Sequence, residues 1–171
     1  MNDGADGRAA TGLGASEGLE LLEVLATLAA QEGKITEAIY PLFFDRRPDA
    51  RPLFGVHALA EREEMIRETL RSLLALAEGE SWLAGNLEAL GRSHFEYGVT
   101  GDMYTDFVDA FVEGAASGLD ESRREALRRG LLRITDSMRR AGDAAARERD
   151  PRRDSTAPWP APGSTTPFAR G

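Results

Sequence analysis

The chain contains no cysteine in its 171 residues. This absence excludes disulfide bonds, thiolate nucleophiles, zinc sites built from cysteine, and iron–sulfur clusters. Histidine is also scarce, because the chain has only two. Any metal would therefore be held by histidine, by carboxylates or by a cofactor.

Long apolar runs and an excess of positive charge are missing as well. No stretch approaches the roughly 20 consecutive apolar residues of a membrane span, and the first residues lack the basic and apolar regions of a signal peptide. The balance of 21 Lys+Arg against 29 Asp+Glu gives a formal charge of −8, which repels a phosphate backbone. We expect a cytoplasmic protein that binds neither nucleic acid nor a membrane.

Composition divides the chain into three parts. Residues 1–16 are rich in Gly, Ala and Asp without periodicity, and residues 145–171 are rich in Pro, Arg, Ser and Thr. Such segments bury too little apolar surface to offset the entropy of ordering, so both ends are predicted to be disordered. Residues 17–144 are long enough to form one domain with its own core.

Apolar residues in this central part recur at helical spacing. Leu21, Leu25 and Leu28 form one stripe, which Gly33 is expected to end, and Gly79 is expected to end a later helix. No segment shows the strict alternation of a half-buried strand. The sequence therefore predicts an all-α fold of six or seven helices.

One histidine lies on an apolar helix face. His94 is at helical spacing from Leu83, Leu87 and Leu90, which turns its ring inward. Such a residue is most often a core histidine bonded to a carbonyl or hydroxyl. A haem iron, in contrast, needs one neutral imidazole, a large apolar slot, an aromatic wedge and a polar group near the metal. The chain has residues for each of these, so both interpretations stay open from this helix alone.

Two stretches resemble the globins, and most closely the single-domain bacterial haemoglobins and the globin module of flavohaemoglobins. "IYPLFFDRRPDARPLFG" is similar to the B helix and CD corner of that family, and "LGRSHFEYGVTGDMY" is similar to its F helix. The likeness covers about residues 20–140. It implies a three-over-three helical sandwich that holds haem b, an iron cofactor, and binds O2 or another diatomic gas such as NO or CO as carrier, scavenger or sensor.

The resemblance also implies roles for single residues. His94 matches the proximal ligand of the iron, and Phe54 matches the phenylalanine of the CD corner that packs on the porphyrin. Tyr40 matches the B-helix tyrosine whose hydroxyl points into the distal pocket. Tyr104 matches a tyrosine beside the proximal histidine that orients its ring. Leu90, one turn before His94, is expected to line the same pocket.

The distal wall is expected from the helix of residues 58–78, where the register is open. Counting back from His94 places Arg62 and Ile66 over the haem, whereas a shift of one residue places Glu61 and Met65 there. The sequence therefore predicts that either Ile66 or Met65 lines the pocket.

Two features depart from the family or lie outside its motifs. The glutamate that completes the proximal set in flavohaemoglobins falls on Ala146, so that set is incomplete. His57 is expected to be exposed to solvent. The acidic residues of the 58–78 helix look like a solvated face with local ion pairs, namely Glu61, Glu63, Glu64 and Glu68.

Two alternatives to a gas-binding globin remain. One is a globin-fold regulatory or dimerisation module without haem, as in some bacterial stress-signalling proteins. The other is an NO dioxygenase, which would need an external reductase because the chain has no room for a flavin domain. A second copy of the chain is left open as a partner.

Overall fold

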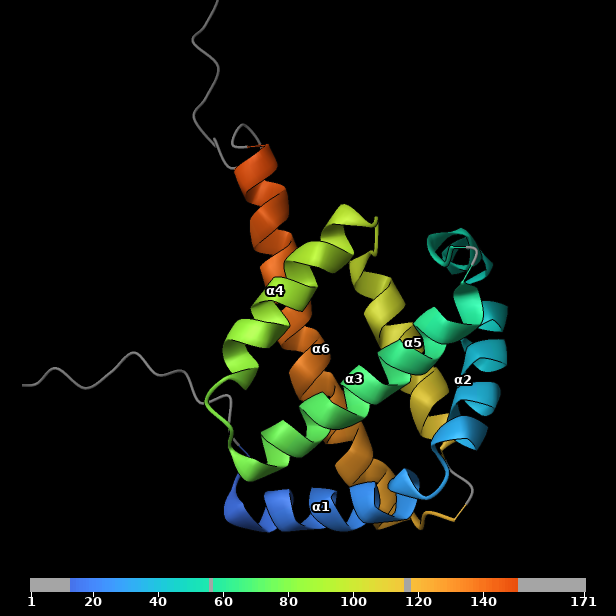
Figure 1. Cartoon of the computed structure of the whole chain (residues 1–171). Helices are drawn as coiled ribbons and strands as arrows, with labels where there is room; N and C mark the ends of the chain where they lie inside the picture. Colours follow the sequence, from blue (N-terminus) through green and yellow to red (C-terminus); the bar gives the residue numbers. More distant parts are fainter. Residues whose placement is uncertain (1–12, 56, 116–117, 151–171) are drawn as a thin grey trace, which may run out of the picture.

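A computed structural model describes residues 13–55, 57–115 and 118–150. Within these residues the chain forms six α-helices and one 3-10 helix, with no strand (Figure 1). Their order is α1 (Ala15–Ala29), α2 (Glu32–Arg46), η1 (Pro48–Leu53), α3 (Ala58–Glu78), α4 (Leu83–Glu96), α5 (Gly101–Gly114) and α6 (Glu121–Arg149). The all-α prediction is confirmed.

Glycine ends one helix as predicted and not the other. At the end of α3, Gly79 has a φ of 70°, and its N–H is bonded to the carbonyls of Ala75 and Leu76. This left-handed cap favours glycine because glycine has no Cβ. Gly33, in contrast, lies inside α2, since α1 already ends at Ala29. The prediction that Gly33 ends the first helix was therefore wrong.

The helices form two layers. In Figure 1, α3 and α4 cross over α5 and α6, while α1 lies below them and α2 stands beside α5. The most extensive packing joins α4 to α6, followed by α2 to α5 and α1 to α3. Fully buried apolar side chains fill the space between the layers, among them Leu28, Ile39, Phe111, Leu127 and Leu131.

The contact between α4 and α6 is made by backbone. A Cβ atom at Gly91 of α4 would lie 2.1 Å from the carbonyl oxygen of Met138 in α6, so only glycine fits there. Gly142 faces the same contact, because its Cβ position lies 3.3 Å from the Gly91 oxygen. These glycines set how close α4 comes to α6.

The ends of the helical part differ slightly from the predicted domain limits. α1 begins at Ala15 and α6 continues to Arg149, beyond the limits of 17 and 144 expected from composition. The last turn of α6 also contacts α4, since Glu148 accepts two bonds from Arg92, at 2.8 and 3.0 Å, and Arg149 donates to both oxygens of Glu96. The rest of both predicted terminal segments, residues 1–12 and 151–171, lies outside the described residues. No helix among the described residues is long and apolar enough to cross a membrane.

Candidate functional site

A cavity of about 690 Å³ lies between α3 and α4, and η1, α2, α5 and α6 complete its walls. Its size is typical of a pocket for a small molecule or cofactor. Most of its surface is apolar, from Phe43, Ala50, Leu53, Phe54, Met65, Leu87, Leu90, Val99, Met103, Phe107, Ile134 and Met138. His94 and Tyr104 are also in its walls.

His94 has one ring nitrogen fixed by its own helix. Its Nδ1 atom lies 2.8 Å from the carbonyl oxygen of Leu90, one turn earlier in α4. A carbonyl only accepts, so Nδ1 holds the proton and donates, which leaves Nε2 with a free lone pair in the neutral ring. Burial lowers the pKa of His94, and the Leu90 bond opposes this only in part. The ring is therefore neutral near pH 7 and suited to bind a metal.

Tyr104 lies beside His94 but does not accept the hydrogen bond from its Nδ1. The two ring centroids are 6.0 Å apart, but Nδ1 is bonded to Leu90, so the ring is oriented by a backbone carbonyl. Burial raises the pKa of Tyr104 to about 12, and the nearby carboxylate of Asp143 adds to the increase. Asp143 lies three residues before Ala146 in α6. An acidic residue therefore lies near Tyr104, although the position that corresponds to the family's glutamate is Ala146.

The structure brings five of the predicted residues into one cavity: His94, Phe54, Leu90, Tyr104 and Met65. The ring of Phe54 is held edge-on against two other rings, Tyr40 at 5.6 Å and Phe44 at 5.5 Å between centroids. Such T-shaped contacts fix the orientation of an aromatic side chain. The corner after η1 therefore presents Phe54 to the cavity.

Two predicted residues, Tyr40 and Ile66, are not among the lining residues that the structure describes. The Tyr40 side chain is only 1% exposed, and its hydroxyl donates to the carbonyl of Arg62 at 3.3 Å. Burial raises the pKa of Tyr40, while the charge of Arg62 lowers it by less. Ile66 is fully buried in the core. Of the two registers left open for α3, the structure has the one that turns Glu61 and Met65 to the cavity.

The acidic face of α3 also forms part of the cavity wall. Glu61, Glu64 and Glu68 line it. Glu61 and Glu64 are exposed, as the prediction of a solvated face requires, whereas Glu68 is half-buried. Glu61 accepts from the backbone N–H of Gly55 at 2.9 Å, and Glu68 accepts from the amide of Asn86 in α4 at 2.7 Å. The predicted ion pairs are present for two of the three, since Glu64 pairs with Arg67 and Glu68 with Arg71.

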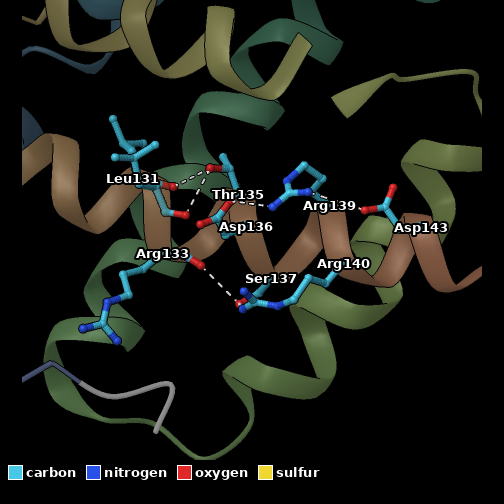
Figure 2. A network of polar contacts seen from close by, with 9 residues as sticks. Leu131, Arg133, Thr135, Asp136, Ser137, Arg139, Arg140 and Asp143 are labelled. Atoms are coloured by element: carbon cyan, nitrogen blue, oxygen red, sulfur yellow. Dashed lines mark hydrogen bonds and ion pairs between the residues drawn. The ribbon is translucent and has the colours of Figure 1, made fainter. Parts of the chain in front are cut away.

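The α6 wall consists of Ile134, Thr135 and Met138, which sequence reasoning did not assign to the site. Their spacing of three and four residues was the available signal. The hydroxyl of Thr135 donates to the carbonyl of Leu131 at 2.8 Å (Figure 2), so its hydrogen bond is made inside the helix. Figure 2 also shows Arg139 between Asp136 and Asp143, which pair with it at 3.4 and 3.5 Å.

The second histidine lies apart from the cavity. His57 is exposed at the N-terminus of α3, as predicted. In the described parts of the chain, no group of three or more His, Asp or Glu residues could hold a metal ion. A metal in the cavity would therefore have His94 as its single histidine ligand and would need a cofactor for its other ligands.

Comparison with known proteins identifies the fold. The structure is similar to that of a bacterial globin from Campylobacter jejuni, with a TM-score of 0.65 and 14% sequence identity. The likeness covers 78% of this chain and 99% of that chain. No protein-family model matches the sequence, and no curated protein is significantly similar to it. The chain thus has the globin fold, as the two sequence stretches predicted.

Proposed function

We propose that the chain binds one haem b in this cavity through His94 and uses it to bind O2 reversibly. The observation that supports this most directly is the hydrogen bond from His94 Nδ1 to the Leu90 carbonyl. It leaves the lone pair of Nε2 free for a ligand, and a second partner on the other nitrogen is the usual arrangement of a metal-binding histidine. The globin fold and the apolar cavity of about 690 Å³ support the same proposal.

Four residues of the cavity would hold the haem. His94 would bind the iron, Phe54 and Leu90 would pack on the ring system, and Met65 would close the α3 side. Their apolar surfaces would keep water away from the metal. When bound, haem supplies a ferrous iron that can coordinate O2, NO or CO.

One alternative is a globin-fold module without haem, which two observations favour. No lysine or arginine is among the described residues that line the cavity, so a haem propionate would meet no cation there. The hydroxyl of Tyr40 is bonded to Arg62 and does not line the cavity. If haem does bind, its propionates would depend on water and on neutral donors of the cavity wall, such as Asn86 and Tyr97.

Haemin titration of the apoprotein tests the proposal. We expect uptake of one haemin per chain with a sharp Soret band, and His94→Ala should lose this band or require added imidazole to restore it, because no cysteine replaces the ligand. His57→Ala is the matched control, since it removes the exposed histidine and should change nothing. A wild-type chain that takes up no haemin, or a His94→Ala spectrum equal to wild type, contradicts the proposal.

A further inference from the structure

The α3 wall of the cavity is acidic, and no described basic side chain balances it from inside. Residues of one helix face line this wall, and three of them are glutamates, namely Glu61, Glu64 and Glu68. The opposite wall, from α4 and α6, is apolar apart from Asn86, His94 and Thr135. A ligand in the cavity would therefore meet carboxylates on one side and apolar groups with few counter-charges on the other.

The three carboxylates are not equally neutralised. Glu64 forms an ion pair with Arg67, and Glu68 pairs with Arg71 at 3.5 Å besides its bond to Asn86. For Glu61 the structure describes only the bond from the neutral N–H of Gly55, and no ion pair within the described chain. Glu61 therefore keeps the least compensated negative charge at the cavity.

We infer that the α3 wall of the cavity weakens the binding of ligands that place a negative charge beside it, relative to uncharged ligands of the same shape, with Glu61 as the main determinant of this selectivity. A unit charge roughly 8 Å from a bound anion, at an effective dielectric constant of roughly 40, weakens binding by about fivefold. Neutral diatomic gases would not experience this repulsion. The statement about gases rests on the proposed function, whereas the selectivity itself depends only on the cavity and its carboxylates.

Two dyes of the same ring system test the inference on the full-length apoprotein. N-phenyl-1-naphthylamine is neutral, and 8-anilinonaphthalene-1-sulfonate is its anionic counterpart, so fluorescence titrations report the effect of one negative charge. Glu61→Gln should bind the sulfonate about fivefold more tightly than wild type and the neutral dye equally well. Glutamine keeps the oxygen that accepts from Gly55, so the corner should stay in place.

Glu63→Gln is the matched control, because Glu63 is an exposed glutamate of the same helix that is not part of the cavity lining. It should leave both affinities within about twofold of wild type, because Glu63 does not line the cavity and its charge is screened over the longer distance to a bound ligand. Glu64→Gln is a second variant at an exposed lining residue, and it should shift the sulfonate in the same direction by less, because Arg67 already compensates its charge.

The ratio of the affinities for the two dyes tests the inference. If wild type binds neither dye, or if Glu61→Gln and Glu64→Gln change the ratio no more than Glu63→Gln, the inference is wrong. In haemin-loaded ferric protein, azide should likewise bind about fivefold more tightly to Glu61→Gln, with neutral imidazole unchanged. A chain that shows the dye pattern but takes up no haemin would refute the proposed function and support the selectivity.

Discussion

Replacing Gly91 by alanine should force α4 away from α6 and destabilise the fold. The added methyl group would lie 2.1 Å from the Met138 oxygen and 2.7 Å from its Cα atom. Both are backbone atoms, so no side-chain rotation relieves the clash, and the helices must separate by about 1 Å or more. Overpacking of this kind costs about 1–3 kcal/mol. The higher helix propensity of alanine returns at most ~1 kcal/mol of that.

Gly85→Ala provides the control for the helix-propensity contribution. Gly85 lies in the same helix and is exposed, and a Cβ there would have no neighbour within 4 Å. This variant should be more stable than wild type by about 0.4–1 kcal/mol. Urea unfolding followed by circular dichroism should therefore place Gly91→Ala roughly 2 kcal/mol below Gly85→Ala.

The difference between the two variants isolates the helix contact. If Gly91→Ala unfolds at the same urea concentration as Gly85→Ala, the approach of α4 to α6 at Met138 is not a tight backbone contact, and the argument fails. The same variant also shifts the helix that bears His94. Haemin titration of Gly91→Ala should show weaker uptake than that of Gly85→Ala.

Three other outcomes follow from the contacts described above. Tyr40→Phe removes the bond to the Arg62 carbonyl and should cost about 1 kcal/mol in urea unfolding. Because that hydroxyl does not line the cavity, the rate of oxygen release should change by less than about threefold. An increase of roughly ten- to hundredfold in this rate, with the rate of CO release unchanged, would instead support the distal role that the resemblance implied. Burial lowers the pKa of His94, so below its ordinary value of 6.5 the unfolded chain binds a proton that the folded chain does not. Stability of the apoprotein should therefore decrease as the pH falls below 6.5, and His94→Leu should lose less between about pH 7 and pH 5 in parallel urea titrations. Limited proteolysis with mass spectrometry should yield a core that retains Glu148 and Arg149, because both are paired with α4, and a stable core ending at residue 144 would contradict this.

The sequence was sufficient for the helices and for the α4 side of the site. The spacing of Leu83, Leu87, Leu90 and His94 places them on one helix face whatever the tertiary fold, and these leucines are buried or half-buried as expected. The two globin-like stretches then predicted the arrangement that the structural comparison confirms. Local periodicity, with a motif at each end of the site, was therefore enough to predict the helices and the α4 wall.

The α3 side of the site depended on information that periodicity does not contain. Ile66 and Met65 are adjacent apolar residues, so the apolar pattern is consistent with either one facing the cavity. Which of them does so depends on the path of the chain through the corner before Ala58. The partner of Tyr40 lies 22 residues away, which no local rule predicts. Glu61 and Glu64 are exposed, as the charge pattern predicted, but that pattern does not show that they also line the edge of a cavity.

The bond from His94 to Leu90 has a consequence for how this site responds to change. Donor and acceptor belong to the same turn of α4, so they move as one rigid unit. The orientation of the imidazole relative to the helix, and which of its nitrogens holds the proton, are therefore determined within α4 itself. The height of the ring in the cavity is a separate degree of freedom, set by how α4 rests on α6. A substitution between these two helices should thus translate the ring while preserving its direction and the position of its proton.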